Sequence, residues 1–510
     1  MQSLYLVAIL SVAWLVLCVF MWRLHRSKLY RSPEHNASIL ITYASQTGNA
    51  QAIGERCAKA LNLSEKSSVI ALNTLTLEHL SHIEKILFVV STYGNGEAPD
   101  NGSMFTKLSK VLSSQRLNHL KYSVIALGDS AYPEFCAFGH QINKTMLTTG
   151  AQLLGDVITV DNYDEQKTEL VNITPDWLKV NLKPEMTPIE ISTVKSTQYW
   201  QLVKRELLNP HCHNEKLFQL SFQSIGPAPI WQAGDLIDIQ PHHPADIVDR
   251  WLLENNFDGN TCLTYQGHTQ TLKAWLLARE LPTPCSYSLD ELLNKLPYLH
   301  KRSYSVASVS QEGKLQLIVR LFEKECINNA EMVTETASYG LASGFLSYYC
   351  QVGNIVEGHI RDISSHHNID QSKPIILIGS GSGLAGLKSQ IAARTLSKST
   401  LAAASWLVYG ERNSNLDLPI NKLLATLEKT QLTKLSYAFS QDKKYPKYVQ
   451  DVLLKEQTTL KQWIDDGAII YVCGCLSGMG EGVHQALTDI LGQSMLEALQ
   501  LQQRYIRDVY

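Results

Sequence analysis

Short apolar runs that end in loops rich in glycine and hydroxyl side chains occur near both ends of this 510-residue chain. Near the start they cover residues 38–43, 86–90 and 122–127, and helical stretches separate them. Continuously apolar runs of this length are typical of parallel strands that helices cover on both faces. The pattern therefore predicts an open, doubly wound parallel sheet over residues 38–182.

The same alternation returns near the end of the chain, in runs at 374–379, 405–410, 434–440 and 468–474. It predicts a second parallel α/β domain over residues 367–510. Between the two, short alternating segments such as 217–222 and 314–322 indicate an antiparallel barrel over residues 190–366. Residues 245–299 have a helical pattern and are predicted to form an insertion in that barrel. The predicted fold class is α/β multidomain.

Charge and cysteine usage exclude some classes of protein. A net charge of −3 argues against nucleic-acid binding. The ten cysteines show no disulfide-like spacing, as expected for reduced thiols. Cys473 and Cys475 are the one close pair, and without a second pair in register they are weak evidence for a metal. No metal site is predicted.

Residues 1–31 form a separate segment. Leu4 to Trp22 carries no charge, and about 20 apolar residues are enough to cross a bilayer. Basic side chains follow at once, at Arg23, Arg26, Lys28 and Arg31, and positive charge stays on the cytoplasmic side. We therefore predict a single-pass membrane anchor with the rest of the chain cytoplasmic. A cleaved signal peptide is the alternative, which the missing basic n-region and A-x-A site disfavour.

Three loops at the carboxyl ends of the first set of strands predict a site for a phosphorylated, flat ligand. Backbone N–H groups and hydroxyls at a helix N-terminus suit a phosphate, although a plain strand–helix turn would use similar residues. Two tyrosines could stack on a planar ring. The candidate residues are Ser45, Gln46, Thr47, Gly48, Asn49 and Ala50, then Ser91, Thr92, Tyr93 and Gly94, then Leu127, Gly128, Asp129, Ser130 and Tyr132.

Two further segments lie in the predicted barrel. Arg302, Ser303, Tyr304 and Ser305 begin a strand, and arginine offers a rigid cationic fork for a pyrophosphate. The second segment precedes a helix-like stretch, so that its N–H groups can also hold phosphate. It consists of Gly340, Leu341, Ala342 and Ser343.

The last domain has its own glycine-rich turn after a strand, which alone is weak evidence for a nucleotide site. Other small or polar residues follow its later strands and strengthen that prediction. The candidates are Gly381, Ser382 and Gly383 in the turn, then Ser440, Gln441, Tyr448 and Gln450.

In order and spacing, these motifs resemble the diflavin reductases, a family that includes the sulfite reductase flavoprotein subunit and the NADPH–haemoprotein reductases. The resemblance covers roughly residues 38–510. It implies a flavodoxin-like FMN domain, a ferredoxin-reductase-like FAD domain and an NADP-binding domain. It also implies that the FMN ring lies between Tyr93 and Tyr132, with Asp161 as a nearby acid.

For the other two cofactors the resemblance implies further roles. Ile318, Val319 and Arg320 would line FAD, and Ser382 matches a family threonine. Ser305, Cys473 and Asp508 would act beside the flavin and the nicotinamide, with Cys473 near the nicotinamide C4. Tyr510 would stack on FAD and leave before nicotinamide approaches.

The nicotinamide domain departs from the family pattern. Gln441 stands where the family has an arginine that binds the 2′-phosphate of NADPH, and Pro446 stands for a lysine. Lys443, Lys444 and Lys447 lie close and could act as point charges. The choice between NADPH and NADH therefore stays open. Three more positions depart from the family pattern. Gly386 stands where the family has a proline, and Cys475 and Gly482 stand where it has acidic residues.

The resemblance implies a membrane-anchored oxidoreductase that passes electrons from NADPH through FAD and FMN to a one-electron acceptor. The acceptor would be a haem protein, such as the sulfite reductase haemoprotein. Residues 38–180 carry fourteen acidic and eleven basic side chains, a slight bias that suits a basic docking face on the partner, although a solvated acidic surface explains it almost as well. Two alternatives remain: a non-catalytic, membrane-tethered flavin relay or docking scaffold, and an NADH-dependent ferric-chelate reductase.

Overall fold

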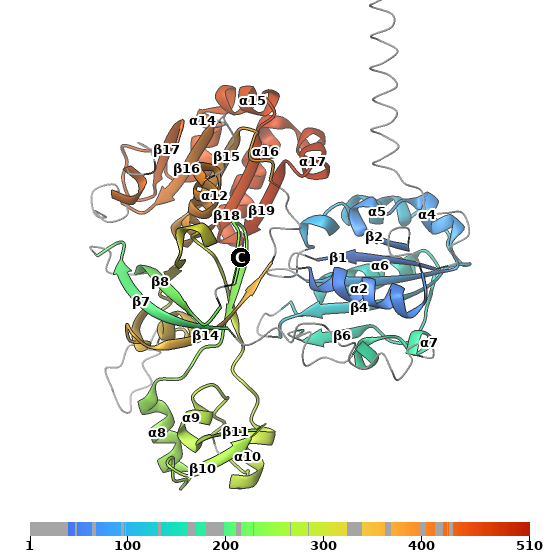
Figure 1. The fold of residues 1–510 in the computed structure, drawn as a ribbon. Helices are drawn as coiled ribbons and strands as arrows, with labels where there is room; N and C mark the ends of the chain where they lie inside the picture. Colours follow the sequence, from blue (N-terminus) through green and yellow to red (C-terminus); the bar gives the residue numbers. More distant parts are fainter. Residues whose placement is uncertain are drawn as a thin grey trace, which may run out of the picture. The chain divides into compact units, whose positions relative to one another are not determined.

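The computed structural model divides into two compact units, residues 1–192 and 193–510, and each is described by itself (Figure 1). The residues that the structure describes are 39–45, 48–63, 68–92, 96, 98–130, 134–161, 163, 170–179, 198–210, 216–227, 229–265, 267–283, 285–323, 339–362, 369–396, 404–413, 422–425, 427 and 432–509.

The first unit contains a parallel sheet with the strand order β2-β1-β3-β4-β5, and β6 also pairs with β4. This is the order of a flavodoxin-like doubly wound sheet. The strands are β1 (Ile39–Ala44), β2 (Val69–Ala71), β3 (Lys85–Ser91), β4 (Lys121–Gly128), β5 (Gln152–Leu153) and β6 (Ile158–Asp161). The helices are α2 (Asn49–Ala60), α4 (Leu77–His82), α5 (Phe105–Leu112), α6 (Ala137–Thr148) and α7 (Asp176–Lys179), with short 3₁₀ turns at η1 (Leu72–Thr74), η2 (Asp100–Gly102) and η3 (Leu170–Ile173).

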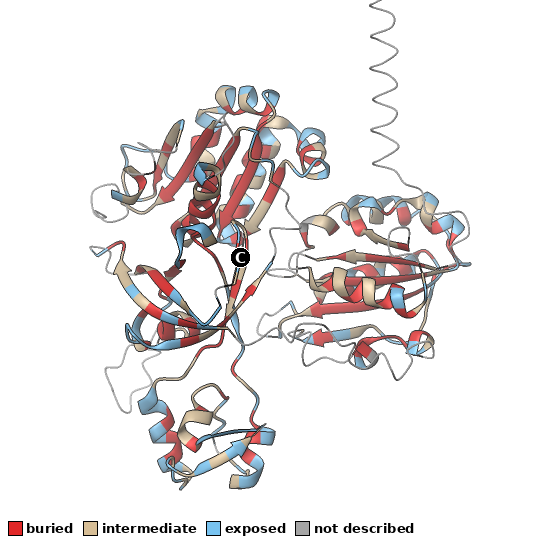
Figure 2. Cartoon of the chain, viewed as in Figure 1, coloured by how far each residue is buried: buried red, intermediate tan, exposed pale blue. Residues whose placement is uncertain are grey.

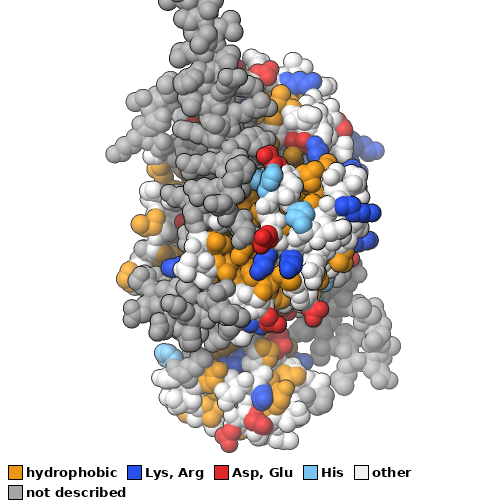
Figure 3. Space-filling model, turned by 90° about the vertical axis from the view of Figure 1, so that its right-hand side faces the viewer, with side chains coloured by type: hydrophobic (Ala, Val, Ile, Leu, Met, Phe, Trp, Pro, Cys, Tyr) orange, Lys and Arg blue, Asp and Glu red, His pale blue; other side chains and the backbone are white. Residues whose placement is uncertain are grey.

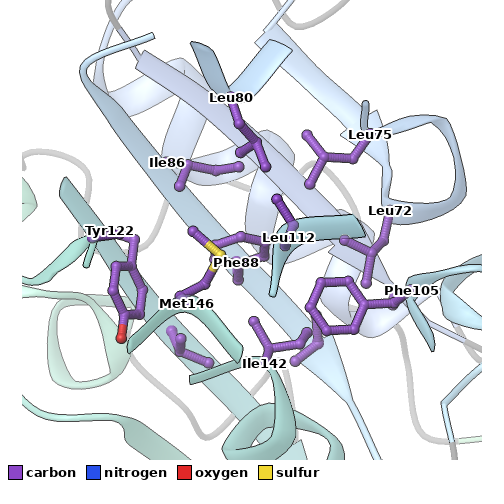
Figure 4. Packing of buried hydrophobic residues seen from close by; sticks show 14 of the residues in the cluster. Leu72, Leu75, Leu80, Ile86, Phe88, Phe105, Leu112, Tyr122, Ile142 and Met146 are labelled. Atoms are coloured by element: carbon purple, nitrogen blue, oxygen red, sulfur yellow. The ribbon is translucent and has the colours of Figure 1, made fainter. Parts of the chain in front are cut away.

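Both faces of this sheet are covered, which explains the unbroken apolar runs in the sequence. On one face Phe88 and Tyr122 pack with residues of α4, α5 and α6, including Leu80, Leu112 and Met146 (Figure 4). On the other face Leu87 and its neighbours pack against α2 and α7. The strands β1, β3 and β4 therefore bury alternate side chains in two separate cores.

The second unit begins with a six-stranded antiparallel sheet in the order β12-β9-β14-β7-β8-β13. A bridge between Val306 and Leu317 joins its two outer strands, so the sheet closes as a barrel. Its strands are β7 (Tyr199–Leu207), β8 (Leu217–Ile225), β9 (Leu236–Ile239), β12 (Arg302–Ser305), β13 (Leu315–Arg320) and β14 (Ile355–Arg361). Among the described residues, short helical turns outside these strands are η5 (Ser310–Glu312), α11 (Leu341–Gly344) and the π-helical η6 (Phe345–Tyr349).

The sequence pattern predicts a helical insertion between β9 and β12, but the insertion also contains two strands. It contains α8 (Ala245–Glu254), α9 (Leu272–Leu276) and α10 (Leu289–Lys295), but also a hairpin of β10 (Cys262–Tyr265) and β11 (His268–Thr271). Ser288 and Glu291 form a capping box that starts α10. The side chains of Trp251, Leu272 and Leu292 belong to one small core that joins the three helices.

The last part of the second unit is a parallel sheet in the order β17-β16-β15-β18-β19. Buried residues concentrate along its strands, as they do in the first unit (Figure 2). The strands are β15 (Ile375–Ser380), β16 (Ser405–Glu411), β17 (Lys434–Phe439), β18 (Ile469–Gly474) and β19 (Tyr505–Val509). The helical elements are η8 (Gly381–Gly383), α12 (Leu384–Leu396), α14 (Val449–Lys455), α15 (Gln457–Asp465), η9 (Leu476–Gly480), α16 (Glu481–Leu491) and α17 (Gln493–Leu501). The predicted α/β multidomain fold class is confirmed.

The predicted membrane location needs correction. Across the described part of the chain, no helix combines the length and the apolar character needed to cross a bilayer. The predicted anchor, residues 1–31, lies outside the described residues. No membrane-spanning helix is therefore part of the described structure, and we withdraw the predicted single-pass location.

Candidate functional site

The loop after β1 leads directly into the N-terminus of α2. Gly48 has a φ of 80°, a left-handed conformation that glycine adopts without strain. The hydroxyl Oγ of Ser45 accepts a hydrogen bond from the backbone N–H of Ala50 at 3.2 Å, and this bond folds the loop over the helix end. The first turn of α2 holds no acidic residue, and its N-cap residue Gly48 offers no side-chain hydrogen bond. Such a helix end favours an anion. Gln46 and Thr47 lie outside the described residues.

The loops after β3 and β4 meet at the same edge of the sheet. The backbone N–H of Thr92, just after β3, donates to the carbonyl of Leu127 near the end of β4 at 2.8 Å, so the two loops start side by side. Asp161, at the end of β6, accepts hydrogen bonds from Ser130 through its backbone N–H at 2.8 Å and its hydroxyl at 2.6 Å. The structure therefore brings these predicted residues together. Tyr93, Gly94 and Tyr132 lie outside the described residues, so the ring-stacking role of the two tyrosines stays a prediction.

In the barrel, the strand β12 carries a polar network on one side. The hydroxyl of Ser303 donates to Oδ1 of Asp238 at 2.5 Å. Nη2 of Arg361 donates to the same oxygen at 2.9 Å and to the Ser303 hydroxyl at 2.6 Å. Arg302 is exposed, while burial raises the pKa of Tyr304. The network fixes β12 and leaves the Arg302 guanidinium available to an anion.

The segment Gly340 to Ser343 is bound to the chain just beyond β13. The backbone N–H of Gly340 donates to the carbonyl of Phe322 at 2.8 Å, and the N–H of Phe322 donates to the Ser343 hydroxyl at 3.1 Å. Phe322 is 63% exposed beside this loop and was not predicted as a ligand-lining residue from the sequence. Its position two residues after Arg320, a predicted FAD-lining residue, could have indicated it. Ile318 and Val319 are buried in cores, so only their backbone could line a ligand.

The glycine turn after β15 packs directly on the end of β18. A Cβ atom at Gly383 would lie 2.1 Å from the carbonyl oxygen of Cys473, and one at Gly379 would lie 2.3 Å from it. Gly381 has a φ of 55°, and a Cβ there would lie 2.0 Å from Nη2 of Arg320. The turn thus needs glycine, because the side chain of Arg320, from the barrel strand β13, packs directly against it.

Asp508 of β19 is the meeting point of the barrel and the last domain. Its Oδ2 atom accepts hydrogen bonds from the Ser305 hydroxyl at 3.2 Å, the Tyr471 hydroxyl at 3.0 Å and the Cys473 thiol at 3.4 Å. Burial, followed by the Asp508 charge, raises the pKa of Cys473 well above its usual value, so the thiol stays protonated. The structure brings together Ser305, Cys473 and Asp508, which the resemblance associates. Tyr510 lies outside the described residues.

Lys388 of α12 joins the same two parts of the chain. Its Nζ donates to the carbonyl of Ala307 at 2.8 Å and to Oε1 of Gln316 at 2.7 Å. Burial lowers the pKa of this ammonium group. Sequence reasoning missed Lys388, because a lysine on a helix is usually solvent-exposed.

The candidate residues after β17 form an open, polar surface. Oε1 of Gln441 accepts from Nδ2 of Asn413 at 2.8 Å. Tyr448 is 45% exposed, and Nζ of Lys447 lies 5.1 Å from the centre of its ring. The side chain of Gln450 fills the space at Gly482, where a Cβ would lie 2.6 Å from Nε2 of Gln450. Lys443, Lys444 and Lys447 are all exposed.

Comparisons with known proteins agree with the predicted fold and family. A flavodoxin family model matches residues 41–172, and an oxidoreductase NAD-binding domain model matches residues 377–485. The chain is similar to the sulfite reductase [NADPH] flavoprotein alpha-component of Bacillus subtilis, with 24% identity over 94% of this chain and 90% of that protein. The protein of the same description from Vibrio cholerae El Tor is 25% identical over 96% of this chain and 92% of its own length. The protein from Buchnera aphidicola subsp. Schizaphis graminum is 25% identical over 95% of this chain and 91% of its own length.

Proposed function

We propose that this chain, a member of the diflavin reductase family, carries electrons from NADPH through FAD and FMN to a haem-protein acceptor. It is an NADPH-dependent flavoprotein reductase, and its cofactors are FMN, FAD and NADPH. The observation that carries the proposal is the meeting of Ser305, Cys473 and Asp508, which come from the barrel and from the last domain.

The described residues fit these cofactors. The acid-free N-terminus of α2 suits the FMN phosphate, and the exposed guanidinium of Arg302 suits the FAD pyrophosphate. The turn at Gly381 to Gly383 follows a parallel strand, as glycine-rich turns of nucleotide sites do, and its glycines let it pack closely on β18 and Arg320. When bound, FAD accepts a hydride from NADPH and FMN delivers electrons singly.

The chain's own groups supply position and charge at the hydride-transfer site. The Ser305 hydroxyl and the Cys473 thiol both point to Oδ2 of Asp508, so the three groups hold one another in a fixed arrangement. The protonated thiol offers no competing nucleophile, because its pKa is raised. The carboxylate of Asp508 can balance positive charge on a nicotinamide ring.

We propose the haemoprotein of sulfite reductase as the electron acceptor, because the relatives are described as flavoprotein components of that enzyme. Acidic and basic side chains are interspersed on the face shown in Figure 3. This distribution favours docking through local complementarity over long-range attraction by a field of one sign.

A single set of measurements tests the donor and the cofactors. The purified protein is assayed for FMN and FAD, then mixed anaerobically with NADPH or NADH while flavin absorbance is followed. We expect both flavins, with NADPH bleaching them, and we expect Asp508→Asn to slow bleaching at least tenfold. Asp489→Asn, an exposed change on α16, is the matched control and should leave the rate unchanged. Bound flavins that neither nucleotide reduces would overturn the proposal.

The acceptor is tested separately. The reduced protein is mixed with a sulfite reductase haemoprotein and sulfite, and sulfide formation is compared with the reduction of ferricyanide. Sulfide production supports the haemoprotein as acceptor. Rapid ferricyanide reduction without haem reduction would refute this acceptor and leave the reductase activity intact.

A further inference from the structure

A buried chain of hydrogen bonds continues beyond Asp508 into the last domain. Tyr471 is 1% exposed, and its hydroxyl donates to Oδ2 of Asp508 at 3.0 Å. The side chain of Gln390 on α12, also 1% exposed, hydrogen-bonds the Tyr471 oxygen in turn. The chain thus runs from Gln390 through Tyr471 and Asp508 to Ser305.

A glycine on α12 provides the room for this arrangement. A Cβ at Gly386 would lie 2.7 Å from the Cys473 sulfur, 3.1 Å from Oδ2 of Asp508 and 3.2 Å from the Tyr471 hydroxyl. Any larger residue would press on all three groups at once. The helix therefore closes the polar cluster on one side and leaves no gap for a side chain between them.

The charge states of the cluster follow from its burial. Burial, and then the charge of Asp508, raise the pKa of Tyr471 well above its usual value, and the same causes raise that of Cys473. Both groups are therefore hydrogen donors at neutral pH, and Asp508 is their acceptor. Hydrogen bonds to a carboxylate stabilise its charged form, which is otherwise costly in a buried place.

We propose that Tyr471 is a positioning residue for hydride transfer, which holds the Asp508 carboxylate ionised and turned toward Ser305 and Cys473. The proposal rests on the proposed function, since it assigns a new role within the same site. In this role Tyr471 itself touches no reacting atom. It acts through Asp508, and Gln390 and Gly386 fix the tyrosine.

The other groups that face Asp508 do not replace this role. On β18 the facing titratable groups are Tyr471 and Cys473, and on β12 the facing group is the Ser305 hydroxyl. On α12 the nearest cation is Lys388, whose ammonium group bonds Ala307 and Gln316 instead. Loss of the Tyr471 hydroxyl therefore removes a donor to Oδ2 of Asp508 that neither Ser305 nor Cys473 replaces.

The test is Tyr471→Phe, with two readouts. The first is the infrared band of the protonated Asp508 carboxyl group, isolated by subtracting the spectrum of Asp508→Asn at each pH. We expect this band to appear at a pH roughly one unit higher in Tyr471→Phe than in the wild type, a tenfold change in the ionisation equilibrium. The second is the pH profile of flavin reduction by NADPH, whose acid limb should move by the same amount.

Tyr122→Phe is the matched control. Its hydroxyl is also buried and donates to Oδ1 of Asn143 at 2.7 Å, but it lies in the first unit. It should move neither readout. A second variant, Gly386→Ala, should disturb the cluster by contact and shift the carboxyl band while keeping the Tyr471 hydroxyl.

The outcomes separate this inference from the proposed function. An unchanged carboxyl band and pH profile in folded Tyr471→Phe would overturn the positioning role, even if the rate fell. A wild-type protein that NADPH cannot reduce would overturn the proposed function, whereas the infrared readout, which needs no donor, would still report whether Tyr471 holds the Asp508 carboxylate ionised.

Discussion

Gly383→Ala tests the contact on which the geometry of the last domain depends. Gly383 lies in the turn after β15, and a Cβ there would be 2.1 Å from the Cys473 carbonyl oxygen and 2.8 Å from the Cα of Gly474. Ordinary contact begins at 3.4 Å, so the turn and β18 must separate by more than about 1 Å. The obstructing atoms are backbone atoms, which cannot rotate away as a side chain can.

The expected cost follows from that displacement. Overpacking of this kind destabilises a domain by about 1–3 kcal/mol, and in a unit of this size each kcal/mol lowers Tm by roughly 2–4 °C. Cys473 would move away from Asp508, and a misplacement of about 1 Å can slow a reaction roughly a hundredfold. We therefore expect a modest loss of Tm with a large loss in the rate of flavin reduction by NADPH.

The assay combines thermal unfolding with anaerobic stopped-flow reduction. Gly480→Ala is the matched control, because the nearest atom to a Cβ there is a side-chain carbon of Val509 at 3.3 Å. That substitution should change stability by less than about 0.5 kcal/mol. If Gly383→Ala kept the wild-type Tm and the wild-type rate, the close contact between the turn and β18 would be wrong.

Three further predictions follow from other parts of the chain. Asn49→Asp places a negative charge in the acid-free first turn of α2, so FMN retention should fall roughly tenfold while FAD content, measured in the same extract, stays constant. Gln441→Arg adds a cationic fork beside the exposed lysines, and the ratio of NADPH to NADH rates should rise roughly ten- to a hundredfold; an unchanged ratio would mean that the 2′-phosphate lies elsewhere. Because burial lowers the folded-state pKa of Lys388 below that of a free lysine, the unfolded chain holds the extra proton at alkaline pH, and wild-type stability should rise as the pH increases toward about 10.4, the ordinary pKa of lysine. Lys388→Met should lack that rise in urea titrations, and a parallel pH dependence of the two proteins would contradict the buried charge.

The flavin-type loops of the first unit could be predicted from sequence because of a simple geometric rule. The carboxyl ends of parallel strands meet at one edge of a sheet, so loops that are far apart in sequence converge. The bond between Thr92 and Leu127 and the bonds between Ser130 and Asp161 follow this rule. The sequence pattern therefore contained enough information to associate those residues.

The cluster at Asp508 was only partly accessible from the sequence. Ser305, Cys473 and Asp508 were associated by family resemblance, whereas Tyr471 lies in a continuous apolar run and looks like an ordinary core residue. Its hydrogen bond depends on the register of β18 and β19, in which Cys473 pairs with Asp508. No local pattern specifies that register.

The hairpin in the insertion was missed for another reason. β10 and β11 have four residues each and carry few buried side chains, so they lack the clear alternation that marks a half-buried strand. The turn between them contains Gly267 with a φ of 79°, and that glycine was the one useful signal. The helical pattern on either side outweighed it.

The hydrogen bond between Ser305 and Asp508 spans 203 residues of sequence. A ribosome that adds about 5–20 residues per second needs roughly 10–40 s to make that stretch. During this interval the barrel can fold while its serine still lacks the carboxylate, so the reactive arrangement cannot form before β19 joins the sheet. Loops closed over such a separation also make folding slow. Nascent chains should therefore acquire their barrel early and their redox competence last, which pulse-labelled hydrogen exchange on stalled chains can resolve.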